Sequence, residues 1–268
     1  MVRIRRVAAD SRPARLMKTL FAALLLLVAG PSCAAPDADG GNDEAPLAVV
    51  TGANRGLGLE MARQLASAGY GVVGTARKPA EAEELRALGV EVRQLDVTDD
   101  ASVAALAEAL GGRAVDLLVN NAGIYPRESG LASLDLDDVK LAFDVNALGP
   151  LRVTRALLPN LREGHGKKIV HVSSSMGSIA SNGRGGSYAY RASKTALNSF
   201  NKTLSIELAG EGFVAIVVNP GWVRTDMGGP NARLTPEQSV AGLLKVIAGL
   251  EPGDNGRFFD HSGEELPW

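Results

Sequence analysis

The chain has 268 residues, and its 28 Lys plus Arg against 30 Asp plus Glu leave a formal net charge of -2, which gives no field to attract nucleic acid. Aromatic residues make up 4% of the chain, too few for a platform that stacks bases. With Cys33 as the single cysteine and no His-Glu-x-x-His pair, the sequence also excludes a disulfide scaffold, a cysteine-rich zinc site and a zincin site.

Residues 1–35 have the pattern of a secretory signal peptide. Six basic residues and one acid precede or adjoin the apolar run 20–28, and small residues follow it. The run is short for a membrane span, which needs about 20 residues. Cleavage with lipidation of Cys33 is a second interpretation, although Pro31 fits a lipidation signal poorly, and a mis-assigned start is a third. Residues 36–46 carry four acids and no base, which predicts a solvated linker.

From residue 47 to residue 268, short apolar runs alternate with stretches of helical periodicity. We predict strands at 47–51, 71–75, 90–95, 115–119, 168–172, 213–218 and 257–259. We predict helices at 58–68, 79–88, 99–110, 134–161, 188–209 and 236–250. The alternation predicts one α/β domain with a Rossmann-type, doubly wound parallel sheet of about seven strands and helices on both faces.

A glycine-rich turn joins the first predicted strand to the first predicted helix, with the spacing G-x-x-x-G-x-G. Gly52 permits a tight turn, Gly56 permits close approach of a ligand to the backbone, and Gly58 permits tight packing of helix on strand. The helix N-terminus offers N–H groups and partial positive charge to a pyrophosphate. On spacing alone a plain turn is the alternative.

The end of the second predicted strand distinguishes the two nicotinamide cofactors. An acid there would bind the ribose 2′-hydroxyl of NAD(H), but the chain reads Ala76-Arg77-Lys78. Arg77 is placed to meet a 2′-phosphate, and Arg55 in the glycine-rich turn adds a second guanidinium. The pattern favours NADP(H), the alternative being that both arginines are solvated surface charges.

Tyr190 and Lys194 are four residues apart on a predicted helix and therefore share one face. A lysine ammonium favours tyrosinate and lowers a tyrosine pKa from about 10. Tyr190 is thus a candidate general acid for a carbonyl or general base for an alcohol. The neighbouring Tyr188 has Ala192 at the same spacing and lacks such a partner.

Together with further motifs, the chain from Leu47 to Trp268 resembles the short-chain dehydrogenase/reductase family. The matching motifs, in family order, are Thr51–Gly58, Asp96-Val97, Asn120–Gly123, Asn146, Ser173-Ser174, Tyr190 with Lys194, and Asn219–Gly221 followed by Thr225. The turn, the tyrosine motif and the closing residues resemble the carbonyl-reductase-like members related to sniffer and C-factor proteins. The resemblance implies a small-molecule carbonyl or alcohol substrate and a homodimer or homotetramer. The leader adds one expected membrane contact, through a lipid anchor at Cys33.

The resemblance also implies the roles of individual residues. The catalytic set is Asn146, which holds a water of a proton relay, Ser174, which binds the reacting oxygen, Tyr190 and Lys194. The cofactor set is Gly52, Asn54, Arg55, Gly56, Leu57, Gly58, Arg77, Asp96, Val97, Asn121, Ala122, Gly123, Tyr190, Lys194, Pro220, Gly221, Val223 and Thr225. The spacing from Ser174 to Tyr190 exceeds the usual one, so Ser175 stays a rival, and the extra residues fall in the loop 181–187.

The leading hypothesis is an NADPH-dependent oxidoreductase that reduces an aldehyde or ketone reversibly. The alternative is a nucleotide-binding regulatory or signalling protein with little turnover. A serine hydrolase is disfavoured because the chain has no Gly-x-Ser-x-Gly elbow. The leader favours export or anchoring, whereas NADPH dependence favours the cytoplasm. We interpret His171 as a packed histidine and His165 as solvent-facing, Trp222 as shaping the pocket or only packing, and Trp268 as a packing residue.

Overall fold

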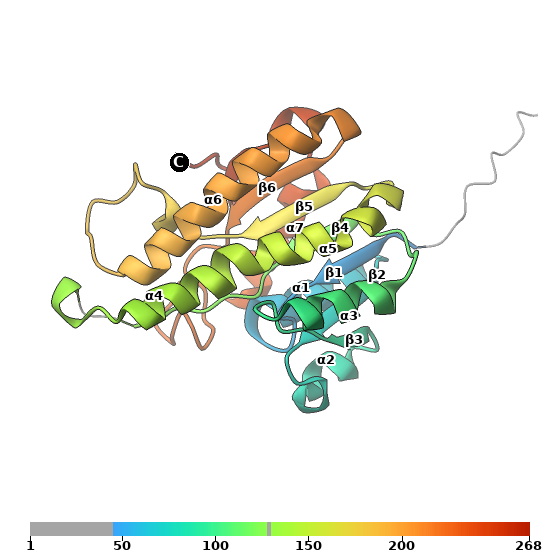
Figure 1. Ribbon diagram of the computed structural model, residues 1–268, viewed down its shortest axis with the longest axis horizontal. Coiled ribbons are helices and arrows are strands. Elements are labelled where there is room, and N and C mark those ends of the chain that lie inside the picture. The colour runs from blue at the N-terminus through green and yellow to red at the C-terminus, as the bar shows by residue number, and fades with distance from the viewer. Residues whose placement is uncertain (1–44, 128–129) are drawn as a thin grey trace, which may run out of the picture. The chain divides into compact units, whose positions relative to one another are not determined.

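The computed structural model describes residues 45–127 and 130–268 of the chain (Figure 1). The predicted leader, with Cys33, and most of the predicted linker lie outside the described residues. Within the described ranges, no helix is both long and apolar enough to cross a membrane.

The described strands form one sheet of seven parallel strands in the order β3-β2-β1-β4-β5-β6-β7. Their bounds are β1 (Leu47–Val50), β2 (Gly71–Ala76), β3 (Glu91–Gln94), β4 (Leu117–Asn120), β5 (Lys168–Val172), β6 (Val214–Asn219) and β7 (Phe258–Asp260). In the central pairing, Val50 lies opposite Gly74 of β2 and Val119 of β4. The predicted doubly wound parallel sheet is confirmed.

The helices differ from the prediction in two places. Their bounds are α1 (Gly56–Ser67), α2 (Glu83–Ala87), α3 (Asp100–Leu110), α4 (Leu136–Phe143), α5 (Gly149–Glu163), α6 (Tyr188–Leu208) and α7 (Pro236–Ala248). The helix predicted at 79–88 is a 3₁₀ turn followed by the short α2, because Ala82 between them has non-helical angles of φ -91 and ψ 57. The helix predicted at 134–161 is divided into α4 and α5 by a π-helical turn, Asp144–Leu148.

Two hydrophobic layers cover the sheet, one on each face. Along β1, Ala48 and Val50 belong to the core that contains apolar residues of α1, α2 and α7. Leu47 and Val49 belong to the opposite core, with residues of α3, α5 and α6. Successive side chains of a strand point to opposite faces, so an unbroken apolar strand supplies both cores at once.

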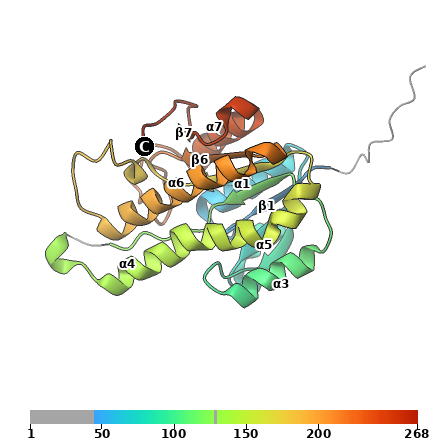
Figure 2. The ribbon, with the colours of Figure 1, turned by 45° about the horizontal axis from the view of Figure 1, so that its top comes forward.

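The carboxyl ends of all seven strands lie at the same edge of the sheet because the strands are parallel. The strand order reverses between β1 and β4, and in such folds ligands bind in the crevice at this switch point. The segments that follow β1, β2, β4, β5 and β6 therefore meet at one place. Beyond this edge α4 continues the line of α5, and the loop before α6 arches outward beside it (Figures 1 and 2).

Candidate active site

The glycine-rich turn after β1 has the backbone that a phosphate-binding loop needs. Gly52 and Gly56 lie in the left-handed region, with φ of 64 and 54. A Cβ on Gly58 would collide with the carbonyl oxygen of Gly52 and the side-chain amide of Asn121. Glycine is therefore required at this entry to α1, where the helix N-terminus meets the crevice.

Thr51 and Asn121 fasten this turn to the segment after β4. The Thr51 hydroxyl accepts hydrogen bonds from the backbone N–H groups of Asn121 and Ala122, each at 3.0 Å. In return the Asn121 side chain donates to the carbonyls of Thr51 at 2.9 Å and Gly52 at 3.1 Å. Asn121 and Ala122 are thus built into the crevice floor, and the contribution of Thr51 was not predicted from the sequence.

The two candidate arginines lie at the exposed rim of the crevice. Arg77 is exposed at the end of β2. Hydrogen bonds from the Thr98 side chain and backbone, and then the charge of Arg77, lower the pKa of Asp96. Arg55 instead makes an ion pair of 3.1 Å with Asp226, in the segment that follows β6. This pair joins the glycine-rich turn to that segment across the crevice.

Tyr190, Ser174 and Lys194 come together at the carboxyl end of β5. Tyr190 and Lys194 project from the first turns of α6 and are buried, at 7% and 4% exposure. Ser174 follows β5 and hydrogen-bonds the Tyr190 side chain, while its hydroxyl accepts from the backbone N–H of Met176 at 3.1 Å. The rival Ser175 is exposed and uses its backbone N–H to bond Asn219. The structure therefore brings Ser174 to the tyrosine.

Burial raises the pKa of Tyr190 to about 12, against the lowering effect of the Ser174 hydrogen bond. This shift is opposite to the one predicted from Lys194. The lysine ammonium donates to the carbonyl of Val172 at 2.8 Å and lies 5.8 Å from the centroid of the Tyr190 ring. Burial lowers the pKa of Lys194 to about 8. The protein's own groups thus keep Tyr190 protonated at neutral pH.

Asn146 lies in the π-helical turn between α4 and α5. Such turns are frequent at functional sites. Its side-chain oxygen accepts from the backbone N–H of Ile124 at 2.8 Å, and its amide donates to the Ile124 carbonyl at 2.9 Å and the Ser193 hydroxyl at 3.0 Å. Pro150, four residues on, has no N–H to donate to the Asn146 carbonyl. A Cβ on Gly123 would lie 3.2 Å from Asn146 Oδ1 and 3.6 Å from Lys194 Nζ, so Gly123 closes over both.

Tyr125 is a site residue that the sequence analysis missed. Its ring meets the ring of Tyr190 edge to face, with 4.6 Å between centroids and 70° between planes. Its hydroxyl pairs with the Ser187 hydroxyl at 2.7 Å. Ser187 itself has left-handed angles, φ 50 and ψ 46, at the start of α6. The position of an aromatic residue two places after Gly123, at the carboxyl end of β4, was the available signal.

The segment after β6 carries the remaining predicted cofactor residues. The Pro220 carbonyl accepts from the Ser239 hydroxyl of α7 at 2.6 Å, and Gly221 has a φ of 77. Val223 forms an isolated parallel bridge with Leu234. A Cβ on Gly56 would lie 3.3 Å from a methyl group of Thr225, which places this segment beside the glycine-rich turn.

The two tryptophans outside this cluster are only partly covered. Trp222 is 52% exposed, and its indole N–H donates to the Gly228 carbonyl at 2.8 Å. Trp268 stacks on Phe258 with 5.6 Å between ring centroids, as a packing residue would.

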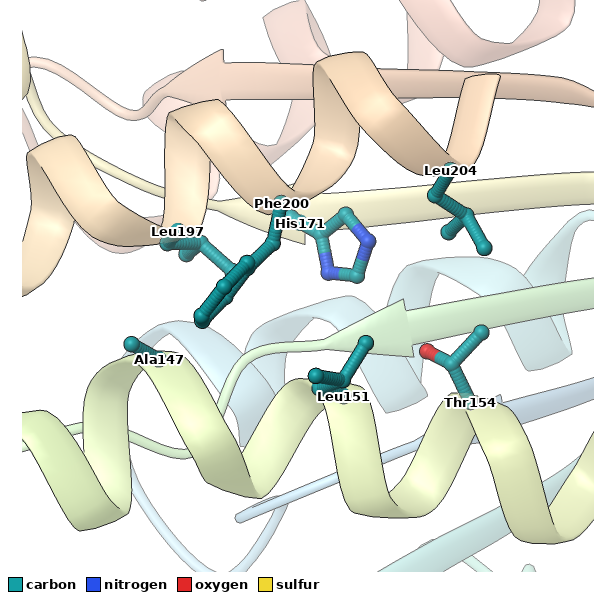
Figure 3. Close-up of a pocket in the computed structure, with 7 residues that line it drawn as sticks. All are labelled: Ala147, Leu151, Thr154, His171, Leu197, Phe200 and Leu204. Atoms are coloured by element: carbon teal, nitrogen blue, oxygen red, sulfur yellow. The ribbon is translucent and has the colours of Figure 1, made fainter. Parts of the chain in front are cut away.

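His171 is a buried packing residue on β5, as predicted, and is not part of the cluster formed by Ser174, Tyr190 and Lys194. It lines a cavity of about 10 Å³ between α5 and α6, together with Ala147, Leu151, Thr154, Leu197, Phe200 and Leu204 (Figure 3). Its Nδ1 lies 3.2 Å from the amide nitrogen of Asn120. Burial, and then the charge of Lys194, lower the pKa of His171 to about 3, so the ring is neutral. His165 is exposed, as predicted.

The family described as short chain dehydrogenase matches residues 46–234. The chain belongs to this family. It is 53% identical to the C-signal of Myxococcus xanthus over 154 residues, 58% of this chain and 93% of that protein. Among solved structures, it is similar to an NADPH-bound carbonyl reductase from chicken fatty liver, with a TM-score of 0.78 and 33% identity over 84% of this chain and 100% of that one. The carbonyl reductase Sniffer of D. melanogaster matches with a TM-score of 0.79 and 30% identity, over 84% of this chain and 99% of that one.

Proposed function

We propose that this short-chain dehydrogenase is an NADPH-dependent reductase that converts an aldehyde or ketone reversibly into an alcohol. The observation that carries the proposal is the meeting of Ser174, Tyr190 and Lys194, the last two of them buried, at the switch point of the sheet. A protonated phenol is the form that can donate to a carbonyl oxygen as general acid. The similarity to carbonyl reductases, one of them NADPH-bound, supports the same chemistry.

The crevice fits a dinucleotide because glycine is required where a phosphate would approach the backbone. Gly52, Gly56 and Gly58 leave no space or no allowed conformation for a side chain. We propose that this turn holds the pyrophosphate, together with Asn54 and Leu57. Arg77 and Arg55 would take the 2′-phosphate, which carboxylates in their place would repel.

The other predicted contacts follow the strand ends. The adenosine would lie against Asp96, Val97, Asn121, Ala122 and Gly123, and the nicotinamide half against Tyr190, Lys194, Pro220, Gly221, Val223 and Thr225. The Asp96 carboxylate already accepts from Thr98 at 2.7 and 3.0 Å, so its role toward the adenine is to shape the wall of the site.

The residues of the chain supply the proton and the electrostatics of the reaction. When bound, NADPH supplies the hydride that goes to the carbonyl carbon. Tyr190 gives its proton to the carbonyl oxygen, and Ser174 donates a hydrogen bond to that oxygen as its negative charge develops. The nearby ammonium of Lys194 stabilises the phenolate that Tyr190 becomes. In alcohol oxidation the same groups act in reverse.

A panel of aldehydes and ketones, assayed by the loss of NADPH absorbance in purified protein, tests the proposal. We expect turnover with at least one carbonyl class and a clear preference for NADPH over NADH. Full binding of NADPH with no turnover across the panel would reject the reductase and favour the alternative function.

That alternative is a nucleotide-binding signalling protein with little turnover, and the similarity to a protein named C-signal favours it. The complete proposed catalytic set weighs against it, because a protein selected only for binding has no need of Ser174 and Lys194 on either side of Tyr190. The carbonyl panel separates the two functions with the parent protein alone.

The proposal includes assembly into a homodimer or homotetramer. Four leucines on α4, on the π-helical turn and on α5 have exposed side chains. Their exposed fractions are 65% for Leu136, 48% for Leu141, 38% for Leu148 and 38% for Leu151. Exposed apolar side chains along consecutive helices are typical of a surface that another subunit covers. Light scattering on the eluted protein measures the assembly directly.

A further inference from the structure

The turn that carries Ser174 is docked on the helix that carries Tyr190 and Lys194. The 3₁₀ turn Ser175–Gly177 follows Ser174 and is closed by a hydrogen bond of 2.8 Å from the Gly177 N–H to the Ser174 carbonyl. A Cβ on Gly177 would lie 3.0 Å from Lys194 backbone and side-chain atoms and 3.2 Å from the Asn198 amide. Glycine at 177 thus lets the turn sit directly on α6.

One side chain of α6 holds this turn on both sides of the catalytic serine. Asn198 lies one helical turn beyond Lys194 and is 3% exposed. Its Oδ1 accepts from the Ser173 hydroxyl at 2.8 Å, and its amide donates to the Gly177 carbonyl at 3.2 Å. The two partners flank Ser174 in the chain, so Asn198 spans the segment in which the serine sits.

The chemistry of the two partners requires an amide. Ser173 offers a donor and the Gly177 carbonyl an acceptor, and a primary amide supplies one group of each kind at the required separation. A buried hydrocarbon at 198 would leave the Ser173 hydroxyl without its acceptor. Thr195 also donates to the Gly177 carbonyl, at 2.9 Å, so this end of the turn has a second hydrogen bond to α6. The Ser173 end depends on Asn198.

We propose that Asn198 is a positioning residue of the active site, which acts through Ser174 by fixing the turn on which the serine stands. It touches neither substrate nor cofactor. It affects turnover by setting the distance and angle at which the Ser174 hydroxyl meets Tyr190 and the reacting oxygen. The inference rests on the proposed reductase activity.

A double-mutant cycle with Ser174 distinguishes this role from plain stability. Displacing a catalytic group by about 1 Å can cost roughly a hundredfold in rate, so we expect Asn198→Ala to lower kcat by about ten- to a hundredfold. In a Ser174→Ala background, the same substitution should lower kcat by less than about threefold, because the group through which it acts is already gone. The NADPH dissociation constant, measured by fluorescence titration, should stay near that of the parent.

Asn201→Ala is the matched control. Asn201 is also a buried asparagine on α6, but its amide donates to the Ala215 carbonyl of β6 at 3.4 Å. Its loss should lower the melting temperature by less than Asn198→Ala does, since it removes one long hydrogen bond rather than two, and should leave kcat within about threefold of the parent. If Asn198→Ala does not fold, Ser173→Ala removes one of the two bonds and enters the same cycle.

The outcomes are separable. An equal loss of kcat from Asn198→Ala in both backgrounds, or a kcat like that of the parent, would overturn the positioning role while leaving the reductase intact. A parent protein that turns over no carbonyl would overturn the proposed function and this inference with it.

Discussion

The proposed catalytic cluster and the proposed cofactor rim of the same crevice are built in opposite ways. Tyr190, Lys194 and Asn146 are 7%, 4% and 0% exposed, and Lys194 and Asn146 are held by hydrogen bonds within the protein. At the rim, the Arg55 side chain is 70% exposed, and Arg77 is exposed as well. Groups that must be aligned to a fraction of an ångström are fixed by the fold, whereas groups that recognise a charge stay solvated until it arrives.

The comparison makes its largest prediction at Tyr190. Tyr190→Phe keeps the ring that packs on Tyr125 but removes the proton donor. We expect kcat to fall by about 10²–10⁴, the range for general acids and bases, while NADPH binding survives because the rim and the glycine-rich turn are unchanged. Steady-state rates on one accepted carbonyl and fluorescence titration of NADPH measure the two quantities.

Two further variants sharpen this result. Lys194→Ala should damage both turnover and NADPH binding, because the ammonium stabilises the phenolate and is also expected to hold the nicotinamide ribose. Tyr188→Phe should change little, since Tyr188 is 43% exposed and has no lysine one turn on. A Tyr190→Phe variant within a few-fold of the parent would contradict the proposed mechanism.

The burial of His171 should also make the stability of the protein depend on pH. Burial lowers the pKa of His171 to about 3 in the folded protein, from 6.5. Between these values the unfolded chain binds a proton that the folded protein does not. The contribution of His171 to the free energy of unfolding is therefore fully present above pH 6.5 and is lost as the pH falls. The contribution is about 1.4 kcal/mol per pH unit in that window.

Urea denaturation between pH 7 and pH 4 of the parent and of His171→Asn measures this slope. The variant should be less stable at pH 7 but lose less of its free energy of unfolding on acidification. His165→Asn, a substitution at an exposed histidine, is the control and should keep the parental slope. Parallel curves for the parent and His171→Asn would show that His171 is not the group responsible.

At the rim we expect a change in cofactor selectivity without a change in chemistry. Arg77→Ala should weaken NADPH by about ten- to a hundredfold, since a charge-assisted pair contributes roughly 1.5–3 kcal/mol, and should leave NADH nearly unchanged. Lys78→Ala is the control, because Lys78 is already paired with Glu81 at 2.9 Å. Equal losses of affinity for both cofactors would show that Arg77 does not bind the 2′-phosphate.

The sequence predicted the architecture well because its signals are local. Most strands are short, mainly apolar runs and each long helix has its own periodicity, so alternation alone implied the parallel sheet, even though the edge strand Glu91–Gln94 is largely polar. The errors fall where a local rule competes with another. Pro79 starts a 3₁₀ turn rather than a full helix, and Pro150 interrupts the hydrogen-bond ladder within a continuous helical pattern, which places the π turn at Asn146.

The sequence predicted the site residues that belong to known motifs, and it missed those that are identified only by their contacts in the fold. Asn198 acts on residues that only the fold brings near, and Tyr125 was marked in the sequence only by its place two residues after Gly123. The direction of the Tyr190 pKa was also beyond the sequence. The helix spacing identified a charged neighbour, but burial of the phenol, which raises the pKa, depends on packing from other elements.

The smallest effect we predict is at the ion pair between Arg55 and Asp226. The side chains are 70% and 78% exposed, so the pair should contribute less than about 1 kcal/mol to stability. In the proposed complex, Arg55 serves the 2′-phosphate, and Asp226 competes with that phosphate for the guanidinium. Asp226→Asn should therefore tighten NADPH by a few-fold at most, with no change for NADH and none in melting temperature beyond about 2 °C.

The background in which Asp226→Asn is made decides what the effect means. In an Arg55→Ala protein, which should bind NADPH more weakly than the parent, Asp226→Asn should have no further effect if the competition for Arg55 is its only route. The gain should also shrink as salt rises, because exposed charges are screened within about 10 Å at 0.1 M ionic strength. If Asp226→Asn instead weakens both cofactors equally, the ion pair holds the segment after β6 in place over the crevice, and Arg55 belongs with the fixed groups of the site rather than with its solvated rim.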